Sequence, residues 1–288
     1  MSNKFKLLDL FSGIGGFSLG LERSGYFETV AFCEIDPFCR RVLKKHWPEV
    51  PQYDDVKTLT ADRLAADGIA VDAICGGFPC QDISTAGKQA GIGEGTRSGL
   101  YSEVIRLAGE LQPKVIILEN VAALLSGENG RWFGRVLGDL AALGYDAEWH
   151  CIPASALGAP HRRDRVWVIA NANGIAKGGL PERASSQFSI ACYDGEILAN
   201  TISVRQQGQR KSVKQCSSPP YIDRQAIDAF TGSVGSIWRA EPAVGRVANG
   251  VPDRSHRLKA LGNAVVPQIP ELIGRAIGQS FFGERTAA

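Results

Sequence analysis

The sequence that decides the fold is Leu7-Leu-Asp-Leu-Phe-Ser-Gly-Ile-Gly-Gly-Phe-Ser-Leu-Gly-Leu21. An apolar run of strand length comes first, a glycine-rich turn follows, and apolar residues at helical spacing complete the stretch. Gly13, Gly15 and Gly16 allow the backbone to come close to a ligand where a Cβ atom would collide. The stretch therefore predicts a strand, a turn and a helix, with a ligand bound at the turn.

A carboxylate strengthens this prediction about 20 residues further on, where Glu34 ends a second apolar run. A carboxylate at that place can accept both hydroxyls of a ribose, so we expect a cofactor that contains a nucleoside. Serine occupies position 18, where a pyrophosphate-binding loop has its third glycine, and the loop has no basic residue. S-adenosylmethionine therefore fits better than NAD. The alternative is a tight turn that binds nothing.

Up to about Asn171, short apolar runs alternate with helical stretches. This alternation predicts an α/β fold of the Rossmann type, a mostly parallel sheet with helices on both faces. Asp36 followed by Pro37 predicts the start of a helix, and Pro113 ends the helix expected over residues 100–111. The expected strands are residues 6–11, 29–35, 71–75, 115–119, 147–153 and 166–170.

The composition is that of a folded globular protein, with 288 residues, 44% of them apolar and 22% charged, and a formal net charge of +2. These values exclude wholesale disorder and a surface coated with positive charge, although separate patches can cancel in the sum. The apolar runs are too short to cross a membrane and no signal peptide is recognisable, so we expect a cytoplasmic protein. Seven scattered cysteines without a C-x-x-C pair predict reduced thiols and no metal site.

A change of composition divides the chain. Residues 171–220 are poorer in apolar side chains than the chain as a whole, and Gly, Ser, Gln and Asn fill the gaps. A helical pattern returns between Leu258 and Ile277. We therefore expect a catalytic domain over residues 1–170, a separate lobe over 171–245, and a C-terminal segment, 246–288, whose helix returns to the first domain.

A candidate nucleophile lies at the end of a further apolar run, in Val71-Asp-Ala-Ile-Cys-Gly-Gly-Phe-Pro-Cys-Gln81. Cys80 follows a proline at the carboxyl end of the expected strand, which is the edge where open α/β sheets bind ligands. Five glycines between Ser84 and Gly99 predict a mobile lid over residues 81–99. The other cysteines expected in strands and helices are read as inert buried side chains.

A candidate acid, Glu119, ends the apolar run Val115-Ile-Ile-Leu-Glu119-Asn-Val, at the same edge of the sheet. Partial burial there would raise the pKa of the carboxyl and let it donate a proton near neutral pH. A cysteine nucleophile with a neutral acid is suited to adding to an electron-poor ring.

At these residues the sequence resembles the DNA (cytosine-5)-methyltransferase family of bacteria and phages. Residues 11–16 resemble its cofactor loop, Gly77-Phe-Pro-Cys-Gln its nucleophile loop, and Glu119-Asn-Val its acid motif. Gly158-Ala-Pro-His-Arg-Arg-Asp-Arg-Val resembles the arginine motif, and Leu261-Gly-Asn-Ala-Val-Val-Pro the C-terminal motif. These blocks stand in the family's order and cover the chain except for roughly residues 171–245.

The resemblance implies a transfer of a methyl group from S-adenosylmethionine to carbon 5 of a cytosine flipped out of duplex DNA. Cys80 would add to carbon 6 while Glu119 holds or protonates ring nitrogen 3. Arg165 would contact the cytosine and position Glu119, and Arg163 would support backbone or acid contacts. Because Arg163 and Arg165 alternate at the expected start of a strand, they should share a face.

The resemblance also implies a set of cofactor contacts. Ile35 stands where many members have an aromatic residue against the adenine, and His161 where glutamine is most frequent. Asp55 could accept from the adenine amino group, or it is simply a solvated loop aspartate. The implied cofactor-binding residues are Phe11, Gly13, Gly15, Glu34, Ile35, Asp55, Val56, Pro79, Leu100, Asn263 and Val265.

Residues 171–245 fall where the family has its variable DNA-reading lobe. Residues 203–257 contain nine Lys and Arg against four Asp and Glu, so the near-neutral total hides a basic stretch suited to phosphates. We expect a monomer that acts on double-stranded DNA, and the sequence leaves open a cognate restriction endonuclease as partner. Methylation of cytosine in tRNA, an inactive DNA-binding relative, and a flexible linker in place of the lobe remain alternatives.

Overall fold

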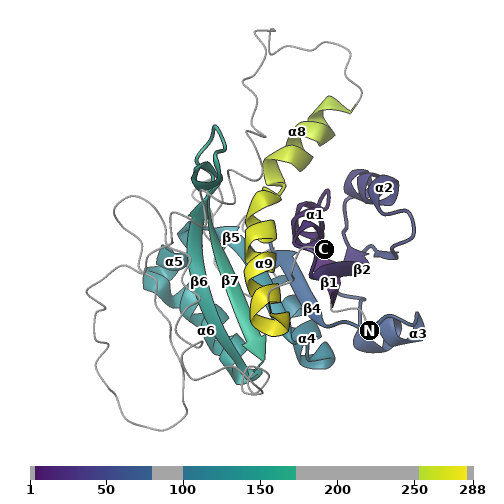
Figure 1. The fold of residues 1–288 in the computed structure, drawn as a ribbon, viewed down its shortest axis with the longest axis horizontal. Helices are drawn as coiled ribbons and strands as arrows, with labels where there is room; N and C mark the ends of the chain where they lie inside the picture. The colour runs from purple at the N-terminus through teal and green to yellow at the C-terminus, as the bar shows by residue number, and fades with distance from the viewer. Residues whose placement is uncertain (1–3, 80–99, 173–252, 284–288) are drawn as a thin grey trace.

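The computed structural model describes residues 4–79, 100–172 and 253–283, which form a helix-covered, seven-stranded sheet (Figure 1). The strand order is β3-β2-β1-β4-β5-β7-β6. Strands β3, β2, β1, β4 and β5 are parallel, whereas β7 is antiparallel to both β5 and β6. The strands are β1 (Phe5–Leu10), β2 (Phe27–Cys33), β3 (Gln52–Tyr53), β4 (Ala73–Gly77), β5 (Val115–Val121), β6 (Tyr145–Pro153) and β7 (Asp164–Ala172). The predicted mostly parallel α/β sheet is confirmed.

The six predicted strands are all present, with ends that differ from the prediction by two residues at most. The structure adds β3, whose two residues pair with Phe32 and Cys33 at the sheet edge. So short a strand has no alternation of apolar and polar residues by which it could be recognised. Strand β2 ends at Cys33, so Glu34 and Ile35 lie in the following loop rather than in the strand.

The helices begin and end close to where the local signals place them. Asp36 caps α2, because its Oδ1 accepts the backbone N–H of Phe38 at 2.8 Å, and Pro37 is the first helical residue. Helix α4 ends at Leu111, before Pro113, as predicted. In the described ranges the helices are α1 (Gly16–Arg23), α2 (Pro37–His46), α3 (Ala61–Ala66), α4 (Tyr101–Leu111), α5 (Ala123–Ser126), α6 (Arg131–Ala142), α8 (Arg254–Asn263) and α9 (Gln268–Phe282), with 3-10 turns η2 (Gly127–Gly130) and η3 (Ala154–Leu157).

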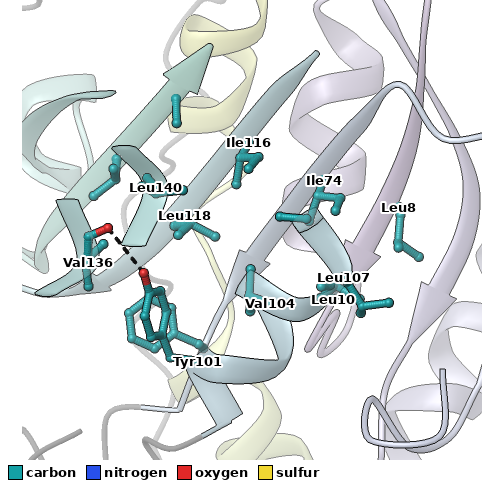
Figure 2. Packing of buried hydrophobic residues seen from close by; sticks show 14 of the residues in the cluster. Leu8, Leu10, Ile74, Tyr101, Val104, Leu107, Ile116, Leu118, Val136 and Leu140 are labelled. Carbon is teal, nitrogen blue, oxygen red and sulfur yellow. Dashed lines mark hydrogen bonds between the residues drawn. The ribbon is translucent and has the colours of Figure 1, made fainter. Parts of the chain in front are cut away.

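Helices cover both faces of the sheet and so create two apolar cores. One core joins alternate strand residues to α4 and α6, where the Tyr101 hydroxyl donates to the carbonyl of Val136 (Figure 2). The other core joins the opposite strand face to α1 and α9, with Phe17 packed edge-on against Trp167. The prediction of helices on both faces is therefore confirmed.

The C-terminal segment is two helices instead of the continuous helical pattern that the sequence suggested. Helix α8 ends at Asn263, Ala264 adopts an extended conformation, and α9 begins after Pro267. A residue before proline is disfavoured in the helical region, which accounts for the interruption at Val265 and Val266. Figure 1 shows α8 projecting away from the sheet, whereas α9 lies against it beside α1.

Glycines bring α1 and α9 unusually close together. A Cβ atom on Gly20 would overlap the carbonyl oxygen of Pro267, and one on Gly278 would overlap the ring of Tyr26. On Gly274 it would lie 2.8 Å from the hydroxyl oxygen of Ser24. Helix α9 therefore packs against α1, and the absence of side chains at these glycines allows the close contact.

Four predictions concern residues outside the described ranges: the nucleophile Cys80, the lid over 81–99, all but the first two residues of the lobe over 171–245, and the basic stretch over 203–257 except for its last five residues. They stay predictions. In the part of the chain that the structure describes, no helix is both long enough and apolar enough to traverse a membrane.

Candidate active site

The turn after β1 has the backbone conformation that the glycines predicted. Gly13 and Gly15 have φ angles of 55° and 85°, in the left-handed region, and Gly15 caps α1. A Cβ atom on Gly15 would lie 2.6 Å from the indole of Trp47. Phe11 also has a positive φ, 53°, which is uncommon for a residue with a side chain. Three residues of this turn therefore have backbone angles that residues other than glycine rarely adopt.

Glu34 links this turn to the start of α2. Its Oε2 accepts the backbone N–H of Gly13 at 2.7 Å, and its Oε1 accepts that of Asp36 at 2.7 Å. Each carboxylate oxygen has a second lone pair, so the group can still accept from a ligand. The neighbouring side chain of Ile35 is 73% exposed and offers an apolar surface beside the carboxylate.

The loop that carries Asp55 and Val56 is held in place by hydrogen bonds from a side chain of α4. Arg106 donates through Nη2 to the carbonyls of Val56 at 3.0 Å and Leu59 at 2.8 Å. The Asp55 carboxylate accepts the backbone N–H of Lys57 at 2.9 Å. Asp55 is therefore a turn-forming residue here, and a role toward adenine stays a prediction.

The C-terminal segment contacts the cofactor turn through Val265. A Cβ atom on Gly16 would lie 2.5 Å from the carbonyl oxygen of Val265. Asn263 is the last residue of α8 and is exposed. Two distant parts of the sequence, predicted to share a site, are therefore close in space.

Glu119 and Arg165 form an ion pair at the carboxyl end of β5. Their Oε1 and Nε atoms are 2.9 Å apart, and their side chains are only 12% and 23% exposed. Burial raises the pKa of Glu119, although the charges of Arg165 and Arg163 oppose this. Gly77 of β4 is the register partner of Glu119, and a Cβ atom there would lie 3.1 Å from Glu119 Oε2. A protonatable acid thus lies beside the strand that leads to Cys80.

Arg163 does not share a strand face with Arg165, contrary to the prediction. Strand β7 begins at Asp164, and Arg163 precedes it with a φ of 43°. Its guanidinium donates to the carbonyls of Gly262 at 2.8 Å and Ala264 at 2.7 Å. The left-handed conformation of Arg163 breaks the alternation that the prediction assumed. The expected backbone contacts of Arg163 are present, and they are made to the C-terminal motif.

Comparison with known proteins identifies the family of this chain. The family model of the C-5 cytosine-specific DNA methylases matches residues 5–225. The chain belongs to the C-5 cytosine-specific DNA methylase family.

Several members of this family are similar along much of the chain. The Type II methyltransferase M.Eco47II of Escherichia coli is 36% identical over 248 residues, which are 84% of this chain and 56% of that protein. M2.BsuMI of Bacillus subtilis is 37% identical over 170 residues, which are 58% of this chain and 42% of that protein. The chain spans about half the length of the curated relatives it matches.

A solved structure is also similar to this methylase-family chain. It is a prophage-encoded E. coli protein described as a DNA modification methyltransferase, 25% identical, with a TM-score of 0.51. The similarity covers 72% of this chain and 62% of that one. The sheet and its helices are therefore those of a Rossmann-like methyltransferase.

The residues that precede Cys80 are fixed by the acid motif itself. The side-chain amide of Asn120 donates to the carbonyl of Phe78 at 3.2 Å, and both residues are buried. Pro79 is half-buried at the last described position before Cys80, and Leu100 resumes the described chain against the core. The place of Asn120 directly after Glu119 was the available signal for it in the sequence.

Asp9 is another group that the prediction missed. It is fully buried in β1, and its Oδ2 accepts the hydroxyl of Ser18 at 2.7 Å, while its carbonyl accepts that of Ser12 at 2.6 Å. Burial raises the pKa of Asp9 to about 7, against the effect of the Ser18 hydrogen bond. A carboxylate within an apolar run was the available signal.

Proposed function

We propose that the chain is an enzyme that transfers a methyl group from S-adenosylmethionine to carbon 5 of cytosine in duplex DNA. The observation that carries the proposal is the buried Glu119–Arg165 pair at the end of β5. A carboxyl whose pKa is raised by burial can give a proton to a ring nitrogen, and the adjacent guanidinium fixes its orientation. The family's methylase relatives support the same reaction.

The described residues fit the cofactor. Glu34 offers a carboxylate for the ribose, Ile35 an exposed apolar side chain for the adenine, and the turn over residues 11–16 has no basic side chain that would select a phosphate. Phe11, Gly13, Gly15, Asp55, Val56, Pro79, Leu100, Asn263 and Val265 complete the proposed set. When bound, S-adenosylmethionine supplies an electrophilic methyl group.

The chemistry of the chain's own residues follows from the cytosine ring. The Cys80 thiolate forms a bond to carbon 6, and the displaced electron pair moves through the ring toward nitrogen 3, where Glu119 supplies a proton. Arg165 keeps the Glu119 carboxyl pointed at that nitrogen. Carbon 5 thereby becomes nucleophilic. Once it is methylated, a base removes the proton from carbon 5, the electron pair of that bond restores the carbon 5–carbon 6 double bond as Cys80 leaves, and the proton on nitrogen 3 returns to Glu119.

A cytosine within a duplex cannot be reached by this arrangement, so the proposal includes extrusion of the base. The basic stretch over residues 203–257 is the candidate DNA-binding surface, and the lobe over 171–245 the candidate reader of sequence. A cognate restriction endonuclease remains a proposed partner, supported by the Type II names of the relatives.

A covalent trap tests the nucleophile. In 5-fluorocytosine, carbon 5 carries fluorine in place of the proton that must be removed, so the bond between the enzyme and carbon 6 is not broken. The covalent adduct therefore accumulates in duplex DNA and migrates as a protein–DNA band. We expect the wild-type chain with cofactor to be trapped and Cys80→Ser not to be. Cys39→Ser is the matched control, since its thiol is buried in α2. Equal trapping of Cys80→Ser would refute the assignment.

Transfer of labelled methyl groups separates the substrates. We expect label in duplex DNA and none in tRNA, and bisulfite sequencing of DNA from expressing cells then reveals the methylated motif. Label in tRNA alone would favour the tRNA alternative. Duplex binding without any transfer would favour an inactive relative.

A further inference from the structure

Arg163 joins two motifs that lie about 100 residues apart in the sequence. Its two terminal nitrogens donate to the carbonyls of Gly262 and Ala264, at 2.8 and 2.7 Å, over separations of 99 and 101 residues. The two carbonyls flank Asn263. A left-handed φ of 43° is uncommon for a residue with a long side chain. Packing and hydrogen bonds must therefore hold this residue in place.

The segment that Arg163 holds is the one that contacts the cofactor turn. Directly after Ala264, the Val265 carbonyl lies 2.5 Å from where a Cβ atom of Gly16 would be. Two residues later, the Pro267 carbonyl occupies the space of a Gly20 side chain. Residues 262–267 are thus confined between the guanidinium of Arg163 and helix α1.

Arg163 also lies within electrostatic range of the acid. Burial lowers the pKa of Arg163 and the charge of Arg165 adds to this effect, while the Glu119 carboxylate opposes the shift. Among the described residues, the ion-pair partner of Glu119 is Arg165, through Oε1 and Nε. The two arginines therefore have different partners, one the acid and the other the C-terminal backbone.

We propose that Arg163 is a positioning residue for the cofactor site, one that keeps residues 262–265 against the turn at Gly16. The inference rests on the proposed function and assigns to Arg163 a role in cofactor affinity rather than in the chemistry at cytosine. A guanidinium can serve two carbonyls at once because its donors form a planar fork. The ammonium of lysine is a point charge, so lysine should replace arginine only in part.

Binding of S-adenosylhomocysteine, the demethylated product, measures this role without any turnover. In calorimetry on the full chain without DNA, we expect Arg163→Ala to weaken binding about tenfold or more and Arg163→Lys to weaken it less. Arg162→Ala is the matched control, because Arg162 is exposed in the same loop and pairs only with Asp164 among the described residues. We expect it to bind as the wild-type chain does.

Kinetics separates positioning from a general loss of structure. We expect the Arg163 variants to raise KM for S-adenosylmethionine more than they lower kcat, with trapping by 5-fluorocytosine DNA retained at saturating cofactor. A variant that is merely less stable would lower the active fraction and leave that KM unchanged. If Arg163→Ala does not fold, Arg163→Lys carries the same comparison.

The outcomes distinguish this inference from the function on which it rests. Wild-type affinity in both Arg163 variants overturns the positioning role alone. A lower kcat with unchanged KM for the cofactor also overturns it, because the loss would then lie in the active fraction or in the chemistry at the base and not in cofactor binding. If the wild-type chain itself fails to bind S-adenosylhomocysteine, the proposed cofactor and the inference are both overturned.

Discussion

The side-chain amide of Asn120 donates to the carbonyl of Phe78, 3.2 Å away, and so ties the strand that carries the acid to the chain that leads to Cys80. Asn120 Oδ1 also accepts the backbone N–H of Val121 at 2.8 Å. One buried amide therefore holds the strand that carries Glu119 to the chain two residues before Cys80.

Asn120→Asp removes the donor and keeps the acceptor, so we expect a selective effect on the Cys80 loop. The Phe78 carbonyl would lose its partner and face a carboxylate, at a cost of about 1–3 kcal/mol. The rate of covalent trapping on 5-fluorocytosine DNA should fall about tenfold or more, while S-adenosylhomocysteine affinity stays near that of the wild-type chain. An unchanged trapping rate would show that this hydrogen bond does not position the loop.

Replacement of Arg165 by methionine should move the pH profile of the reaction. The arginine charge stabilises the Glu119 carboxylate, so its loss raises the pKa of Glu119 above the already raised value. Activity that needs the protonated acid then persists to higher pH, and the descending limb of kcat/KM should shift upward by about 1 unit or more, at a lower maximum. Glu119→Gln, which cannot donate a proton of that acidity, should lose activity by about 100-fold or more. A descending limb that stays in place would assign it to another group.

Asp9 should make the stability of the chain depend on pH. Its pKa is raised to about 7 in the folded state from 3.8, so the folded chain binds more protons than the unfolded one between these values. This contribution is present below pH 4 and is lost as pH rises through about 7, with a slope of at most about 1.4 kcal/mol per pH unit. Glu148, whose pKa burial also raises to about 7, adds a slope of the same sign.

Denaturant unfolding at several pH values tests the contribution of Asp9. Asp9→Asn keeps an oxygen that can accept the Ser18 hydroxyl and removes the titration, so we expect a flatter pH dependence between pH 5 and 8. The slope from Glu148 should remain, and Glu148→Gln is the matched control that removes it. Identical slopes for the wild-type chain and Asp9→Asn would contradict the assignment.

Gly20→Ala tests the close contact of α1 with the C-terminal segment. The added methyl group would overlap the backbone carbonyl of Pro267, which cannot rotate away, and we expect a loss of about 1–3 kcal/mol in the free energy of unfolding. In Gly138→Ala the methyl group would enter open space at an exposed position of α6, where the better helix propensity of alanine should stabilise by about 0.5–1 kcal/mol. Thermal unfolding compares the two variants directly. Equal effects would mean that α9 can shift to accommodate the methyl group.

Much of the fold follows from local signals in the sequence. The apolar runs locate β1, β2, β4, β5, β6 and β7, because a buried strand needs a continuous apolar stretch and leaves that pattern in the chain. Asp36 and Pro37 locate the start of α2, since capping depends on residues that are neighbours in sequence. The sequence also predicted that Glu34 lies near the glycine-rich turn, because one helix and one strand separate the two, as in other nucleotide-binding folds.

The relationships that were missed depend on contacts between distant residues. The hydrogen bonds of Arg163 to residues 262 and 264, and that of Asn120 to Phe78, are set by tertiary packing and have no local pattern. The left-handed conformation of Arg163 contradicts the simple alternation of a strand. Strand β3 is too short to leave a periodic signal, and Pro267 divides a helical pattern that otherwise continues.

The contact between α1 and α9 has a consequence for how the protein is made. The turn at Gly16 is translated early, yet the carbonyl of Val265 that closes against it is translated after the sheet and after residues 173–252. A nascent chain on the ribosome can therefore form β1 to β5 in order, but its cofactor turn stays open on one side. A chain that ends before Val265 therefore lacks the backbone carbonyl that closes against the turn at Gly16.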